Sequence, residues 1–111
     1  MEPSPVIRIW VTNKNNKAIT AEMTESIVAF LSIALENGCL GSKFAEDEER
    51  VIVYTTWSNE MNLEHFRSSN DYKVHETNIV QSFTAAGFDI PGDILFNSTG
   101  KILFDNKSES S

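Results

Sequence analysis

Apolar and polar residues alternate near the start of the chain. In the run VIRIWVT, residues 6–12, the period of two places Ile7 and Ile9 on one side and Arg8 and Trp10 on the other. Alternation of this kind predicts a β-strand. The polar run NKNNK that follows predicts an exit loop.

The pattern then changes to a helical period. From Met23 to Leu35, apolar residues recur at spacings of three and four and form one face. Thr20 is suited to cap this helix, and the acidic Glu22 follows in the first turn, where the helix dipole favours negative charge. Gly38 is the expected stop.

Two further β-rich runs follow, CLGSKFA over residues 39–45 and RVIVYTTW over residues 50–57. Because β-branched and aromatic residues favour strands, these runs predict a β-hairpin. The acidic run AEDEER, residues 45–50, joins them and predicts a solvated turn that needs no partner.

Two helical patterns come next. Ser58 or Asn59 can cap a short helix that ends at the Ser68-Ser69 pair, and Ser69 or Asn70 can cap a longer one that ends at Gly87. In the longer helix, we expect one face to carry Tyr72, His75, Ile79, Phe83 and Ala86.

After the turn FDIPGD, residues 93–106 predict a last strand interrupted by an Asn-Ser-Thr-Gly turn. The segment 94–104 can form one broken strand or a small hairpin.

The order β-α-β-β-α-β predicts an α+β protein with the ferredoxin-like split βαβ fold, in which both helices cover one face of an antiparallel sheet. We expect Trp10 and Arg8 to share the other face, which would not be polar. An apolar face without helices must be covered, and a second copy of the chain is the simplest partner. The sequence therefore predicts a homodimer.

Composition limits the possible functions. With 111 residues, the chain fits one domain over residues 6–106, with a flexible start at 1–5 and a disordered tail at 107–111. The net charge of -7 argues against nucleic acid as a partner. No apolar run approaches a membrane span, and Cys39 has no second cysteine to pair with. These features predict a cytoplasmic protein without a membrane partner.

Two stretches resemble a known family. NGCLGSKF, residues 37–44, and VIVYTTWSNEMNLEHFRSSNDYKVH, residues 51–75, are similar to the antibiotic biosynthesis monooxygenase-like domains of the dimeric α/β-barrel group. The resemblance spans about residues 6–86. It implies a homodimeric barrel with a pocket in each protomer between sheet and helices. Some members oxidise quinols with oxygen and no metal or flavin, and others degrade haem.

His75 is the candidate catalytic residue, because it stands where the resemblance places the haem-ligating histidine of the haem-degrading branch. A neutral imidazole could ligate iron or act as a base toward a phenolic substrate. The alternative is a partly buried histidine that packs or hydrogen-bonds between helix and sheet. His65 and His75 alone do not indicate a metal site.

Phe66, Trp10, Tyr54, Arg8 and Trp57 are the candidate substrate-binding residues. Trp10, Tyr54 and Arg8 could line either the pocket or the interior of the barrel. Aromatic rings could stack on a flat substrate, and Arg8 could pair with a phenolate or carboxylate, or with an acid across a dimer. Trp57 could instead serve packing. Two departures concern the haem-degrading branch. Phe66 replaces a tryptophan of that branch, and Ile7 or Arg8 stands near the place of its asparagine.

A third departure concerns the quinol-oxidising members, in which an asparagine stands four residues before the tryptophan. Val53 occupies that position here. The leading hypothesis is a cofactor-independent monooxygenase-like protein whose apolar pocket binds a small aromatic or quinol-type compound. The alternatives are a haem-binding or haem-degrading protein and a non-catalytic dimer that binds a metabolite.

Overall fold

The computed structural model describes residues 4–106. Along the chain lie β1 (Val6–Asn13), α1 (Ala21–Glu36), β2 (Cys39–Glu46), β3 (Arg50–Trp57), α2 (Glu60–Arg67), α3 (Asn70–Ala85) and β4 (Ile94–Lys101). The expected tail at 107–111 and most of the expected flexible start at 1–5 lie outside the described residues.

The helices begin and end where side chains can satisfy their free backbone groups. The Thr20 hydroxyl accepts a hydrogen bond from the Met23 backbone N–H at 3.2 Å and caps α1. Asn59 caps α2 and Ser69 caps α3 in the same way. Gly38 and Gly87, which follow α1 and α3, have positive φ angles of 102° and 94° that favour glycine.

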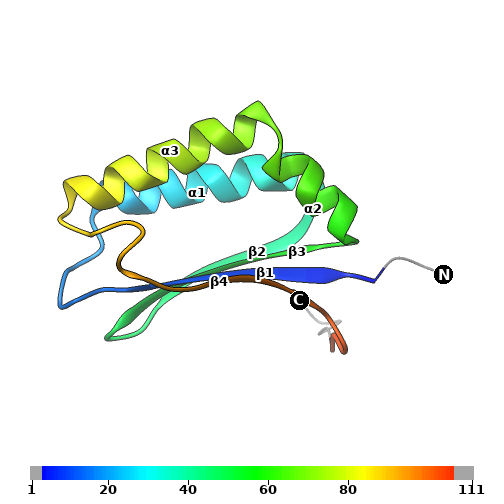
Figure 1. The fold of residues 1–111 in the computed structure, drawn as a ribbon, viewed down its shortest axis with the longest axis horizontal. Coiled ribbons are helices and arrows are strands. Elements are labelled where there is room, and N and C mark those ends of the chain that lie inside the picture. The colour runs from blue at the N-terminus through cyan, green and yellow to red at the C-terminus, as the bar shows by residue number, and fades with distance from the viewer. Residues whose placement is uncertain (1–3, 107–111) are drawn as a thin grey trace.

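The strands form one antiparallel sheet in the order β2-β3-β1-β4. All three helices lie over the same face, and the opposite face carries none (Figure 1). This arrangement confirms the α+β, ferredoxin-like fold, in which α2 and α3 together take the place of the second helix.

Trp10 and Arg8 lie on the face of the sheet that the helices cover, and not on the bare face as we expected. Trp10 is opposite Val53 and Arg8 is opposite Thr55 across β1 and β3, and both pairs lie on the face covered by the helices. The bare face takes Ile9 instead. The expectation was wrong because a two-residue period separates the sides of a strand but does not say which side the helices cover.

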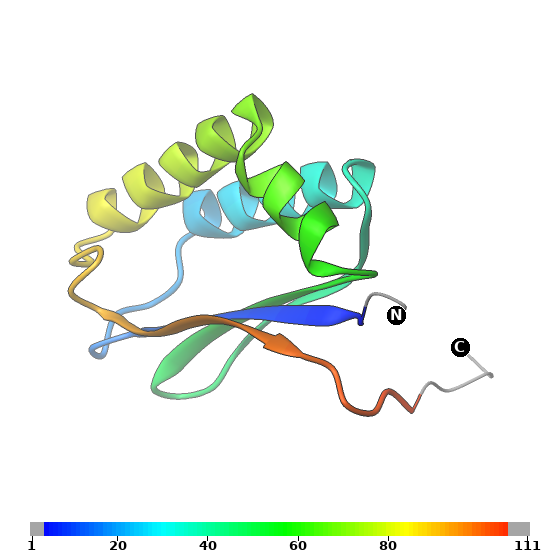
Figure 2. The ribbon, with the colours of Figure 1, turned by 45° about the vertical axis from the view of Figure 1, so that its right-hand side comes forward.

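The expected Asn-Ser-Thr-Gly turn is also wrong. The strand β4 runs without interruption through Asn97 and Gly100, and both residues pair with β1. The long central strand β1 offers backbone partners along its whole length, and these outweigh the local turn preference of the four residues. Beyond β4, the chain extends away from the body of the molecule (Figure 2).

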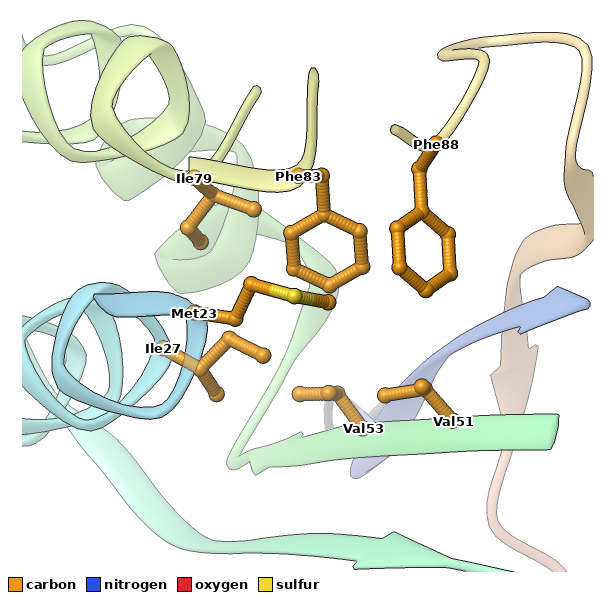
Figure 3. Close-up of a cluster of buried hydrophobic side chains, with 7 residues drawn as sticks. All are labelled: Met23, Ile27, Val51, Val53, Ile79, Phe83 and Phe88. Carbon is orange, nitrogen blue, oxygen red and sulfur yellow. The ribbon is translucent and has the colours of Figure 1, made fainter. Parts of the chain in front are cut away.

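The core lies between the sheet and the two long helices. Figure 3 shows its main cluster, in which side chains from α1, β3, α3 and the following loop meet: Met23, Ile27, Val51, Val53, Ile79, Phe83 and Phe88. A second cluster, which includes Trp57 and Phe66, joins α2 to the sheet. Burial of Cys39 in this cluster raises the pKa of its thiol, as expected for a small buried apolar residue. No helix within residues 4–106 is long and apolar enough to cross a membrane.

In the acidic turn between β2 and β3, Asp47 makes the hydrogen bonds. Its carboxylate accepts bonds from the backbone N–H groups of Glu49 at 2.9 Å and Arg50 at 2.6 Å, and from the Arg50 guanidinium at 2.7 Å. These bonds, above all the one from the Arg50 side chain, lower the pKa of Asp47 to about 2.

We predict that Asp47→Asn lowers the melting temperature at pH 7, and that the difference from the wild type shrinks as the pH falls toward 2. The lowered pKa means that the carboxylate stabilises the fold above its ordinary pKa, and that this contribution is lost as the pH falls through about 2. Glu48→Gln is the control, because the exposed Glu48 should have little effect at any pH. A pH-independent difference for Asp47→Asn would contradict this assignment.

Candidate functional site

A cavity of about 200 Å³ lies between the covered face of the sheet and the helices. It is lined by residues from three strands, β1, β3 and β4, and from all three helices. Most of the lining is apolar or aromatic, and its charged members are Arg8, Arg67 and Glu76. A small cavity of this composition suits an apolar ligand held by a few polar groups.

Aromatic side chains form one wall of the cavity. The Trp57 ring stacks on the Phe66 ring with centroids 5.4 Å apart, and Tyr72 meets Phe66 edge to face at the same distance. Trp57 is fully buried, and its indole N–H donates to the Thr55 hydroxyl at 2.9 Å. Because every ring is fixed by a neighbour, this wall is rigid before any ligand binds.

Trp10 also lines the cavity, outside the group of rings formed by Trp57, Phe66 and Tyr72. Its ring lies 5.4 Å from that of Phe83 and is only partly buried, so part of it faces open space. Tyr54 also borders the cavity, but alternation along β3 places its side chain on the bare face of the sheet, beside Ile9. Of these two predicted aromatic residues, Trp10 is therefore the one whose ring can touch a ligand.

Arg8 reaches the cavity from the central strand. Its guanidinium donates to the Thr99 hydroxyl on β4 at 2.9 Å, a contact that orients the side chain. Burial lowers the pKa of Arg8, and the nearby positive charge of Arg67 lowers it further. Two arginines that repel each other therefore lie close together in the cavity lining.

Arg67 ends α2 beside this position. Its Nη1 donates to the Glu64 carboxylate at 3.1 Å, while its Nε is buried and has no hydrogen-bond partner among residues 4–106. Burial lowers the pKa of Arg67, but hydrogen bonds with Tyr72 and Glu64 outweigh it, so the pKa is raised overall. The guanidinium stays charged in a partly desolvated place.

Tyr72 and Glu76 follow one turn apart on α3, and both line the cavity. Burial raises the pKa of the Tyr72 hydroxyl, and its hydrogen bond with the Glu76 carboxylate raises it further. Glu76 itself is exposed, so its carboxylate stands where the cavity meets solvent. A neutral phenol and a carboxylate thus lie side by side at the rim.

Of the five residues expected to bind substrate, the structure brings four together at the cavity: Phe66, Trp10, Arg8 and Trp57. Tyr54 borders the cavity, but its side chain lies on the bare face of the sheet. The structure does not bring His75 to the cavity. The partly exposed His75 ring uses Nδ1 to bond to the Asp71 backbone carbonyl at 2.8 Å, within its own helix. The cavity-lining stripe of α3 runs through Tyr72, Glu76 and Phe83, and His75 lies to its side because the helix turns by 3.6 residues.

Several polar lining residues were not predicted from the sequence. Glu76 stands four residues after Tyr72, and that spacing could have indicated a shared face. Asn97 lies opposite Trp10 on β4, but it belongs to the segment that was expected to be a turn. Arg67 follows Phe66 at the end of a short helix, and no sequence pattern marks it as buried.

The histidines do not form a metal centre. Within residues 4–106, no three His, Cys, Asp or Glu side chains gather closely enough to hold a metal ion. The cavity instead offers guanidinium groups, a phenol, a carboxylate and an amide, which can bind and orient a polar end of a ligand or move a proton.

Comparison with known proteins identifies the fold. No family model and no curated protein matches the sequence. Among solved structures, SnoaB from Streptomyces nogalater, described as a cofactor-independent oxygenase, matches with a TM-score of 0.64 at 9% identity, covering 94% of this chain and 96% of SnoaB. Rv0793 from Mycobacterium tuberculosis matches with a TM-score of 0.62 at 11% identity, over 95% of this chain and 99% of that one.

A candidate antibiotic biosynthesis monooxygenase from Caulobacter crescentus matches with a TM-score of 0.61 at 10% identity, over 94% of this chain and 92% of that one. The three matches cover almost the whole of each chain, so they concern the entire domain and not a shared fragment. At identities this low, the matches show a common fold and give no evidence of a common activity. The chain has the fold of the antibiotic biosynthesis monooxygenase-like domains, as the sequence resemblance implied.

Proposed function

We propose that this protein is a cofactor-independent monooxygenase-like protein that binds a small aromatic or quinol-type compound in the cavity between sheet and helices. The observation that carries the proposal is the cavity itself, which combines a rigid aromatic wall with a phenol and a carboxylate at the rim. The fold shared with SnoaB supports it, because SnoaB is described as a cofactor-independent oxygenase.

The size of the cavity favours a small ligand. Its volume of about 200 Å³ lies below the range of roughly 300–1,000 Å³ that is usual for drug-sized ligands. One or two aromatic rings match this space, whereas a haem macrocycle does not. Because His75 lies outside the cavity lining as well, the haem-binding alternative has no support from the geometry.

The reaction needs a base that takes a proton from the substrate. Loss of that proton leaves a carbanion, stabilised by the aromatic ring, which can react with molecular oxygen without a metal. Glu76 is the residue placed to act as this base, because its carboxylate borders the cavity and already accepts a hydrogen bond from Tyr72. This assignment replaces His75, which the sequence had favoured for the same step.

We predict that Glu76→Gln lowers the turnover of an oxidisable quinol by about 100-fold or more, since general bases contribute at least that much. His75→Ala is the matched control on the same helix. It should keep turnover near the wild-type rate and change the free energy of unfolding by no more than about 0.5 kcal/mol, as for other surface substitutions. Oxygen consumption with a panel of quinols measures both.

The opposite result, with His75→Ala inactive and Glu76→Gln active, would show that His75 acts as the base. Haemin is added to the protein as a negative control, and we expect no shift of the Soret band of haemin. A strong Soret shift that His75→Ala abolishes would contradict the proposal in favour of a haem-binding protein.

We also propose that the protein is a homodimer joined through the bare face of the sheet. This face carries apolar side chains from the three adjacent strands β3, β1 and β4, among them Ile9, Ile52 and Phe96. Phe96 is 48% exposed in the single chain. A continuous apolar sheet face of this kind is costly to leave in water, and a second copy can cover it symmetrically.

We predict that sedimentation at micromolar concentration gives about twice the chain mass of 12.5 kDa. Ile9→Lys should convert the protein to a monomer, because it places a charge at the centre of the bare face. Val28→Lys is the control, since Val28 is an equally apolar residue, 50% exposed, on α1. A wild-type monomer, or dissociation by Val28→Lys alone, would rule out this interface.

A further inference from the structure

Arg8 and Arg67 lie close enough for their charges to interact, and both line a cavity whose other residues are mostly apolar. Two carboxylates accompany these positive charges: Glu64, which pairs with Arg67 at 3.1 Å, and Glu76 in the lining. A positive group that is partly buried in an acidic protein costs free energy unless something compensates for it.

Within residues 4–106, the donors of these guanidinium groups are satisfied only in part. The Arg8 guanidinium donates to the neutral Thr99 hydroxyl, and Arg67 donates to Glu64 through Nη1 and also hydrogen-bonds with Tyr72. The Nε of Arg67 is buried without a partner among the described residues. A buried donor that lacks an acceptor destabilises the protein, and a ligand that supplies the acceptor removes this cost. The guanidinium groups thus have unused donors next to the aromatic wall.

We propose that Arg8 and Arg67 form the anion-binding end of the cavity, and that the ligand is a flat aromatic compound of one or two rings that carries a carboxylate. The inference rests on the proposed function and restricts its substrate class to aromatic carboxylates. A carboxylate can accept hydrogen bonds from the donors that the protein leaves unused, among them the Arg67 Nε–H. Its two oxygens also match the planar fork of a guanidinium, which can bind both at once.

The arrangement of the lining gives this ligand one orientation. Its rings lie along the wall formed by Trp57, Phe66 and Tyr72, and its carboxylate lies toward Arg8 and Arg67. Arg8 is held in place by Thr99, so binding orders little that was free before. In this orientation the ring system remains next to Glu76, where the proposed proton transfer takes place.

Calorimetric titration of 2-naphthoate and 2-naphthamide tests the proposal, because the two compounds have nearly the same shape and differ in charge. We expect the acid to bind about tenfold or more tightly than the amide, the size expected of a hydrogen bond to a charged group. Arg67→Gln and Arg8→Gln should each remove most of this preference and leave the affinity for the amide within about twofold.

Arg50→Gln is the matched control. It removes the same charge from an exposed residue of the turn between β2 and β3 that does not line the cavity, and should leave the preference unchanged. Arg67→Lys and Arg8→Lys provide a second pair of variants, in case the glutamine variants unfold. They keep the charge but not the fork, so they should keep part of the preference. Thermal melting of each variant shows that it is folded.

Equal affinity for acid and amide in the wild type would overturn the proposal, as would an equal loss of preference in Arg50→Gln. The outcomes also separate this inference from the proposed function. Quinol oxidation without a preference for the acid would refute only the inference. An arginine-dependent preference for the acid, with no oxygen consumption for any compound, would refute only the proposed function. No binding of either compound, together with no oxygen consumption for any quinol, would refute both.

Discussion

The two-residue period of β1 and β3 is the constraint on which the candidate site depends. Because successive side chains of a strand point to opposite faces, Arg8 and Trp10 must share a face with Thr55 and Trp57 once the two strands are paired. The helices cover this face, so a charged residue and several aromatic rings are enclosed together. A slip of one residue in the position of β1 would move Arg8 and Trp10 to the bare face, away from Thr55 and Trp57, and would place Ile7 and Ile9 under the helices.

The second requirement is a wall that does not collapse into the cavity. The stacked pair of Trp57 and Phe66 joins the end of β3 to α2, and Tyr72 on α3 closes against it. These rings support one another and leave space on the side of Trp10 and the arginines. The aromatic wall therefore has a structural role and a proposed binding role at the same time. For Trp57, full burial and a hydrogen bond to Thr55 account for the structural part.

The sequence predicted the order and the limits of most elements, because caps, glycine stops and apolar periods are local signals. It did not predict that Asn97 belongs to a strand, since the pairing with β1 that decides this involves residues distant in sequence. His75 and Glu76 illustrate the limit for the site. They are neighbours on α3 and point about 100° apart, so the rotation of the helix about its axis decides which one borders the cavity. Packing between α3 and the sheet sets that rotation, and the period alone does not.

The central claim is that the end of the cavity with two arginines binds an anion. The NMR signals of the arginine Nε–H groups test it most directly, because each reports on the partner of one guanidinium. On addition of 2-naphthoate, the account predicts a large shift of the Arg67 signal, whose Nε has no partner in the described structure, and a shift of the Arg8 signal, with Arg50 unchanged. Shifts of equal size for all three, or a shift confined to Arg50, would contradict it.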